Sequence, residues 1–119
     1  MTEIVVDLPF PPSINRLWRV VGRRLILSDE YRAWLANAKN FMLYTGGGKQ
    51  RLKGHFTYKV ILDETERGRT RDGDNFASKA ILDLLQSVEV IENDKLADSG
   101  SWAWGIAPHG CRVVLTAAE

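Results

Sequence analysis

The chain is poor in the side chains that usually build disulfides and zinc sites. Its 119 residues include one cysteine and two histidines. A lone cysteine excludes an internal disulfide and any zinc site made of several thiolates. His55 and His109 stand far apart in the chain, with no further histidine at ligand spacing. Neither a zinc site nor a histidine-assisted nucleophile is therefore expected.

Long apolar runs and targeting segments are missing as well. No apolar run approaches the roughly 20 residues that a bilayer-spanning helix needs. The opening stretch MTEIVVDLPFPPS has neither the basic start nor the small-residue cleavage site of a signal peptide. We therefore expect a cytoplasmic protein with no membrane partner. Cys111 is set in an apolar, strand-like run and is expected to be a buried structural thiol.

Two common phosphate-binding and cation-binding loops are excluded by their spacing. The stretch TGGGK lacks the length and the Ser or Thr of a P-loop, and no organic cofactor is expected. An EF-hand counted from Asp72 needs Gly at its sixth position and Glu at its twelfth. The chain has Ala77 and Asp83 at those positions.

What is present is the composition of one ordinary globular domain over residues 1–119, with 45% apolar and 26% charged residues. The net charge of +1 hides an uneven distribution. Residues 11–71 contain thirteen Lys or Arg against five Asp or Glu, whereas residues 72–119 contain three against eight. This asymmetry is typical of a polyanion-binding surface beside an acidic centre. A dipolar surface without function fits the composition as well.

The apolar periodicity predicts an α+β domain. After Ser28, a good N-cap, apolar side chains recur at spacings of three and four over residues 31–42, and again over residues 80–88. Alternating stretches predict a hairpin or two short strands around Gly22, and strands at residues 3–8, 55–63, 101–106 and 111–117. Two helices are too few for a doubly wound sheet. The expected fold is therefore a mixed β-sheet with two main amphipathic helices.

The stretch RTRDGDNFASKAILDLL sets two acids one residue apart, just before the second helix. If the backbone is extended there, Asp72 and Asp74 point to the same side and can hold one cation. Clustered oxygen ligands favour Mg²⁺ or Mn²⁺. Glu92 and Asp94, in VIENDKL after the helix, could supply a third acid, and Lys79 could direct its ammonium to the same place. An ordinary turn with a helix N-cap explains the pattern equally well.

Four motifs in order make the chain resemble the RusA family of Holliday-junction resolvases. LPFPPSINRLWR resembles the family's L-P-x-P-P-S-x-N-R signature, RDGDN its R-D-x-D-N core, KAILDLL its lysine helix and VIENDKL its closing acidic motif. The resemblance implies a RusA-like fold over most of the chain. It also implies a metal-dependent endodeoxyribonuclease that hydrolyses phosphodiesters in four-way DNA junctions during recombination and repair. Members of the family work as homodimers, and some are carried by prophages.

The resemblance assigns roles to particular residues. The metal-binding and catalytic carboxylates fall on Asp72, Asp74 and Asp94, and the catalytic lysine falls on Lys79. With Mg²⁺, or with Mn²⁺, these residues would promote the attack of water on the scissile phosphate. The motifs and the basic clusters beside them indicate six residues for DNA binding: Asn15, Arg16, Arg19, Arg69, Arg71 and Asn75.

Two positions depart from the family pattern. The family places its lysine three positions after the motif asparagine, whereas NFASK places Lys79 four positions after Asn75. Unless the first helical turn absorbs the extra residue, Lys79 is rotated by about 100°. Where the family often has two adjacent aspartates, this chain has Asn93 and Asp94, which leaves Asp94 as the ligand. Asp83 could assist the site or could be an ordinary helical surface residue.

Other basic residues could contact DNA or could simply be solvated. Arg23 and Arg24 extend the cluster at Arg19, and a glycine-rich segment expected to be flexible carries Lys49, Arg51 and Lys53. Two further functions stay open: a non-catalytic module that binds branched DNA, and a nuclease that acts on another branched or single-stranded DNA. The complete set of three aspartates argues against the non-catalytic module. Only cleavage assays can distinguish a nuclease of another substrate from a junction resolvase.

Overall fold

In the computed structural model, four strands form one mixed sheet in the order β1-β6-β4-β5. The structure describes residues 2–12, 18–66 and 78–118. The strands of this sheet are β1 (Glu3–Leu8), β4 (Phe56–Asp63), β5 (Ala97–Gly105) and β6 (Cys111–Ala117). Strand β6 is antiparallel to both β1 and β4, whereas β4 and β5 are parallel. The expected mixed sheet is confirmed.

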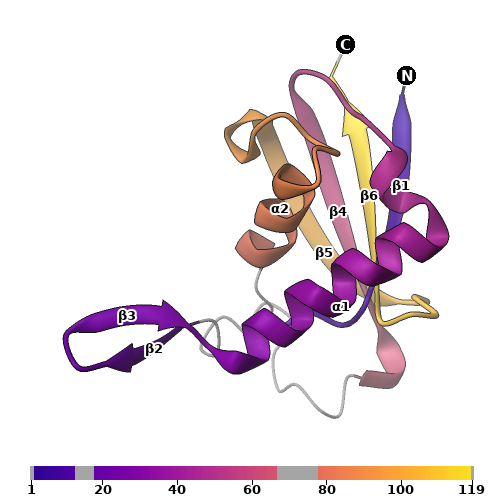
Figure 1. Cartoon of the computed structure of the whole chain (residues 1–119). Helices are drawn as coiled ribbons and strands as arrows, with labels where there is room; N and C mark the ends of the chain where they lie inside the picture. The colour runs from indigo at the N-terminus through magenta and orange to yellow at the C-terminus, as the bar shows by residue number, and fades with distance from the viewer. Residues whose placement is uncertain (1, 13–17, 67–77, 119) are drawn as a thin grey trace.

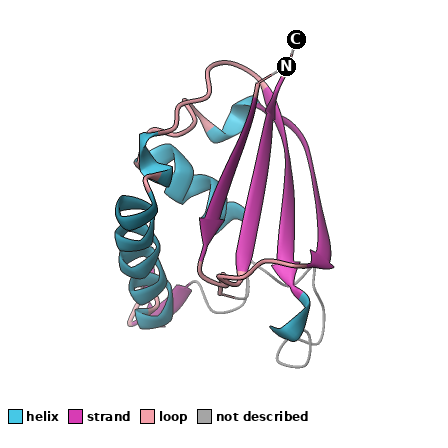
Figure 2. Ribbon diagram, turned by 90° about the vertical axis from the view of Figure 1, so that its right-hand side faces the viewer, coloured by secondary structure: helices cyan, strands magenta, loops and turns pink. Residues whose placement is uncertain are grey.

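Both long helices lie on the same face of this sheet and leave the other face uncovered (Figures 1 and 2). They are α1 (Asp29–Thr45) and α2 (Ser78–Ser87), and short 3₁₀ turns follow at η2 (Gly47–Lys49), η3 (Glu64–Glu66) and η5 (Asp94–Leu96). This arrangement is the α+β fold that the apolar periodicity predicts. Within the described ranges, no helix is long and apolar enough to cross a membrane.

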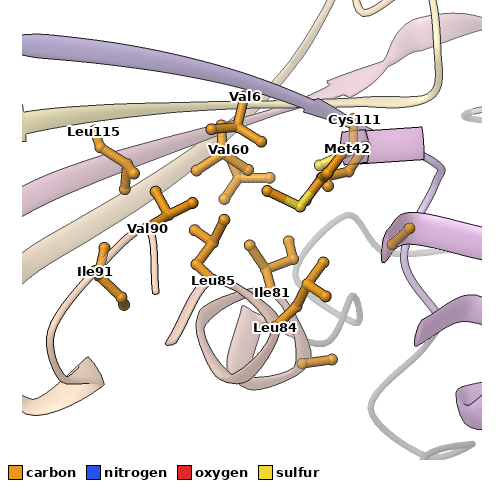
Figure 3. Close-up of a cluster of buried hydrophobic side chains, with 14 of the residues drawn as sticks. Val6, Met42, Val60, Ile81, Leu84, Leu85, Val90, Ile91, Cys111 and Leu115 are labelled. Carbon is orange, nitrogen blue, oxygen red and sulfur yellow. The ribbon is translucent and has the colours of Figure 1, made fainter. Parts of the chain in front are cut away.

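The core lies between the sheet and the two helices. Alternate residues of the strands point toward the helices, so that β4 buries Phe56, Val60 and Leu62 while its intervening residues are more exposed. Figure 3 shows the aliphatic side chains of α2 packed against those of the sheet. Cys111 belongs to this cluster and is fully buried, as expected. Burial, followed by the nearby charge of Asp7, raises the pKa of its thiol to about 12.

The local signals around the first helix act as the sequence predicts. The Ser28 hydroxyl accepts a hydrogen bond from the Tyr31 N–H at 3.0 Å and so caps α1. Before it, β2 (Trp18–Val21) and β3 (Arg24–Leu27) form a separate two-stranded antiparallel sheet. Gly22 has a φ of 64°, which suits the first central position of a tight hairpin turn. The expected hairpin is confirmed.

The connection between β4 and β5 positions the candidate site. Two parallel neighbouring strands cannot be joined by a hairpin, because the chain must return to the end of the sheet where the first strand began. Helix α2 makes this return, and η5 then leads into β5. Helix α2 and η5 are therefore described parts of the connection from β4 back to the start of β5. Most of the residues that the sequence marks for chemistry lie on this one crossover.

Strand β5 begins earlier than expected. It starts at Ala97, four residues before the predicted Ser101, and its central tryptophans lie on one face. The rings of Trp102 and Trp104 contact each other edge to face, with 5.9 Å between their centroids. Because these residues are paired with Val60 and Leu62, they lie on the helix-covered side of the sheet, at its outer strand.

Candidate functional site

Only part of the expected site falls within the described residues. Lys79 and Asp94 are described in full, and Arg19 is placed in β2, opposite Ile26. Seven of the expected residues lie outside the described ranges: Asn15, Arg16, Arg69, Arg71, Asp72, Asp74 and Asn75. The described part of the site therefore lies on α2, which carries Lys79, and on η5, which carries Asp94.

Asp94 is held in place through its backbone, and its carboxylate is left available. It is the first residue of η5, and its N–H donates to the Oε1 atom of Gln86 at 2.9 Å. The side chain of Asn93 caps the same turn by accepting from the Lys95 N–H at 2.9 Å. Among the described residues, the Asp94 carboxylate forms no ion pair. The asparagine that replaces the family's first aspartate thus has a structural role here.

Glu92, the other acid considered as a third ligand, is engaged elsewhere. Its Oε1 atom accepts a hydrogen bond from the Gly54 N–H at 2.6 Å. The same two segments are joined by a backbone bond from the Leu52 N–H to the Val90 carbonyl at 2.7 Å. Glu92 therefore connects the segment before β4 to the segment after α2. Because its carboxylate is already bonded, the geometry favours Asp94 as the acid of this motif that can bind a metal.

Lys79 is the second residue of α2 and faces solvent. Its side chain is 65% exposed, and its Nζ lies 3.8 Å from Oδ1 of Asp83, one helical turn later. The buried residues of α2 are Ala80, Ile81, Leu84 and Leu85. On a helical projection, Lys79 lies on the side of α2 opposite to these core residues.

A polar stripe runs along this outer face of α2. Lys79, Asp83 and Gln86 follow each other at spacings of four and three, which places them in one line. Gln86 closes the stripe by its bond to the Asp94 backbone. Lys79 and Gln86 are separated by about 10 Å along the helix axis. The stripe therefore runs from Lys79 to the residue that bonds Asp94. The described Lys79 ammonium pairs with Asp83 and not with Asp94.

Gln86 and Asn93 are the two residues of this arrangement to which the sequence analysis gave no positioning role. The signal for Gln86 is its position seven residues after Lys79, on the same helical face. The signal for Asn93 is a short polar side chain just before a turn, the usual place of a capping residue.

The first turn of α1 lies beside this stripe. Burial, and after it the negative charge of Asp83, raises the pKa of the Tyr31 hydroxyl above its ordinary value. Tyr31 also belongs to the same buried cluster as Ile81 and Leu84 of α2. The start of α1, and with it the base of the β2–β3 hairpin, is therefore adjacent to α2.

Two groups of exposed basic residues lie beyond opposite ends of α1. Arg23 and Arg24 are exposed at the end of the hairpin, on the α2 side of the molecule. Lys49, Arg51 and Lys53 are exposed beyond the other end of α1, whose 17 residues span about 25 Å. The segment that carries the second group is anchored to the core after η2. Leu52 is buried there and forms an isolated parallel β-bridge with Ile91.

The described residues alone do not complete a metal site. Within them, no three His, Cys, Asp or Glu side chains lie close enough together to hold an ion. Of the three expected ligands, Asp94 alone is described, and its unpaired carboxylate is a hard oxygen donor of the kind that Mg²⁺ and Mn²⁺ prefer.

A hollow on the uncovered face of the sheet is a separate feature. It measures about 380 Å³ and is lined mainly by β4, β5 and β6, with Thr57, Lys59 and Ser101 among its residues. Because α2 and η5 lie on the other side of the sheet, this hollow includes neither Lys79 nor Asp94.

The comparison with known proteins finds a relative along the full length of the chain. The chain is 30% identical, over 125 aligned residues, to the crossover junction endodeoxyribonuclease rusA of Enterobacteria phage HK97. The alignment covers 100% of this chain and 97% of the relative. No protein-family model matches the chain.

Proposed function

The chain belongs to the RusA family, and from this membership we propose that it is a crossover junction endodeoxyribonuclease that resolves four-way DNA junctions. The observation that carries the proposal is the extent of the similarity, which leaves no part of the chain unmatched. The stretch from Arg69 to Lys79 and the stretch around Asp94 are both included. The order of the four sequence motifs supports the same conclusion.

The proposed reaction is the hydrolysis of a phosphodiester by water, with a divalent ion held by Asp72, Asp74 and Asp94. Mg²⁺, or Mn²⁺ in its place, would neutralise charge on the scissile phosphate and lower the pKa of a coordinated water. Asp94 is suited to this role because Gln86 and Asn93 fix the backbone around it while its carboxylate stays unpaired among the described residues. The side chain of Glu92 is already bonded to Gly54.

Lys79 would place a positive charge against the phosphate oxygens as charge develops on them. Its exposed position at the start of α2 leaves the long side chain able to reach a ligand, and Asp83 holds it only at 3.8 Å. An exposed ion pair of this kind is weak, so the ammonium can exchange Asp83 for a phosphate at little cost.

The DNA would be positioned by phosphate contacts from residues on both sides of the acidic centre. Asn15, Arg16 and Arg19 precede or begin the hairpin, and Arg69, Arg71 and Asn75 flank the two aspartates in sequence. Arginine and asparagine side chains are common donors to phosphate oxygens, which fix the register of a duplex without reading its sequence.

The test is cleavage of a synthetic four-way junction, a matched duplex and a flap, each with Mg²⁺ and with EDTA. Wild type should cut the junction in Mg²⁺ and leave the duplex intact. Asp72→Asn and Asp74→Asn should abolish cleavage, while junction affinity stays equal or rises slightly because a negative charge near phosphate has gone. Glu3→Gln is the matched control, because Glu3 is an exposed carboxylate of β1 that points away from the helices.

The outcomes separate this proposal from its competitors. Junction binding without cleavage in any metal would identify a non-catalytic branch-binding module. Preferential cutting of the flap or of single strands would identify a nuclease of another substrate. Full activity in Asp72→Asn would exclude the proposed metal ligands.

A further inference from the structure

The β2–β3 hairpin projects from the body of the molecule. Its strands pair only with each other, in a sheet separate from the main one, and Figure 1 shows it extending beyond the first turn of α1. Its base is anchored, because Leu27 packs against the core and its carbonyl accepts a hydrogen bond from Arg32 Nη2 at 3.1 Å. The hairpin is therefore a fixed arm with its turn in solvent.

The end of this arm carries apolar side chains that the protein itself does not cover. Val20 and Leu25 are opposite each other in the antiparallel register and are 72% and 62% exposed. Directly opposite residues share a face of the hairpin, so the two side chains form one small apolar surface. Val21, next to the turn, is 49% exposed. Such a surface at the end of an arm is typical of a contact site.

The same end is positively charged. Arg23 lies in the turn and Arg24 begins β3, and both side chains are exposed. Neither guanidinium forms an ion pair with another described residue. A second copy of the arm would bring four arginines together, whereas a polyanion would neutralise them. The charge therefore favours a nucleic acid over another protein chain as the partner.

The faces of the bases are the broadest apolar surfaces of a nucleic acid, and they are open only where a base pair lacks a stacked neighbour. In a continuous duplex the faces of the bases are covered, whereas at a branch point the terminal pairs of the arms can present them. Side chains such as leucine are known to enter between base pairs while nearby arginines hold the backbone. The arm leaves the body at the start of α1, whose Tyr31 shares a buried cluster with α2, the helix that carries Lys79, so both can face one substrate.

We propose that the hairpin end, residues 20–25, is a wedge that docks at the branch point of the DNA. Val20 and Leu25 contact the open faces of the base pairs, and Arg23 and Arg24 contact the adjoining phosphates. This inference rests on the proposed action on branched DNA and assigns to the hairpin the selection of junction over duplex. The catalytic residues on the crossover are not involved in this selection.

The experiment compares paired variants on a junction that carries 2-aminopurine beside the branch point and on a matched duplex. Val20→Thr with Leu25→Thr places β-branched side chains, which suit a strand, and removes apolar surface, whereas Val20→Ile with Leu25→Ile preserves that surface. Arg23→Gln with Arg24→Gln removes the charge. Leu43→Thr is the surface control, because Leu43 is equally exposed but lies near the far end of α1. Circular dichroism and light scattering verify the fold and the oligomer of each variant.

Wild type should unstack the reporter, seen as a rise in 2-aminopurine fluorescence, and prefer the junction. The threonine pair should lose the rise and about tenfold of the preference, with duplex affinity unchanged, and the isoleucine pair should retain both. The glutamine pair should weaken binding to both DNAs and reduce the slope of log affinity against log salt by about two.

Two results would overturn the wedge. One is a threonine pair that keeps the fluorescence rise and the junction preference. The other is a threonine pair that loses its oligomeric state, which would make the hairpin a contact between subunits. A wild type that binds junction and duplex equally would overturn the wedge as well. A wild type that prefers the junction but does not cut it in Mg²⁺ would instead overturn the proposed function, and the two failures are therefore distinguishable.

Discussion

At the scale of single residues, the polar stripe of α2 determines how Lys79 can be tested. Its contact with Asp83 is long and exposed, and such i,i+4 pairs contribute only about 0.3–0.5 kcal/mol to stability. Replacing Lys79 should therefore leave the fold intact. Any loss of turnover can then be assigned to the reaction. Because NFASK places Lys79 one position later than the family pattern, the role of Lys79 needs a direct measurement.

We expect Lys79→Ala to lower the single-turnover rate of junction cleavage by on the order of a hundredfold, with junction affinity nearly unchanged. Asp83→Asn, which releases the lysine but keeps its charge, should stay near wild type. Arg71→Ala is measured beside them under saturating protein. If Lys79→Ala cuts within about threefold of wild type, a difference under about 0.7 kcal/mol, the lysine leaves the catalytic set and Arg71 is the candidate to replace it.

Cys111 gives a residue-scale prediction about pH. Its thiol pKa is about 12 in the fold, against an ordinary value of 9.0. Below about pH 9 the Cys111 thiol is protonated in both the folded and the unfolded chain. Above it, the unfolded chain releases the proton first, so stability is lost as the pH rises from about 9 to about 12, by up to about 1.4 kcal/mol per pH unit. Urea unfolding of wild type and Cys111→Ala over this range should show the steeper fall in wild type only. Parallel pH profiles would contradict the prediction.

At the scale of elements, the sequence could predict every long element because burial imposes a period on each. The N-cap at Ser28, the turn at Gly22 and the buried alternation of β4 and β6 are local signals. The first half of β5 was missed for the opposite reason. Asp98, Ser99 and Gly100 are polar or small and exposed. Ser99 and Gly100 are strand because β4 pairs with them, and Asp98 lies where the register shifts. An edge strand of this kind has no apolar period to detect.

Gly100 in this missed segment should be sensitive to any side chain. A Cβ at this position would lie 2.1 Å from Cζ of Tyr58, whose ring crosses it from the neighbouring strand. We expect Gly100→Ala to lower the free energy of unfolding by about 1–3 kcal/mol, because the ring must be displaced. In a Tyr58→Ala background, the same change should be neutral or stabilising, since alanine suits a strand better than glycine. A urea double-mutant cycle measures the difference, and an equal cost in both backgrounds would refute the contact.

At the scale of the whole molecule, the crossover from β4 to β5 gathers the chemistry, and the hairpin lies beside it. The motif order could predict the family, which the full-length similarity confirms, whereas the roles that it assigns to single residues stay predictions. It could not predict that Gln86 bonds the Asp94 backbone from the same face of α2 as Lys79. Nor could it predict that the hairpin arginines and the basic residues after η2 lie beyond opposite ends of α1. Both facts depend on how α2 and α1 pack on the sheet. No local pattern of residues encodes that packing.

The symmetry of the proposed substrate leads to the last prediction, which concerns the oligomer. A four-way junction has two equivalent strands to cut, so two copies of one site related by a twofold axis match it. Sedimentation at micromolar concentration should give about twice the chain mass of 13.4 kDa. Mixed dimers of wild type and Asp72→Asn, purified through two different tags, should then cut one strand and leave a nicked junction. Wild-type dimers should release two duplexes under the same conditions. A strict monomer that makes both cuts, or a mixed dimer that still resolves the junction in one binding event, would show that one site cuts both strands.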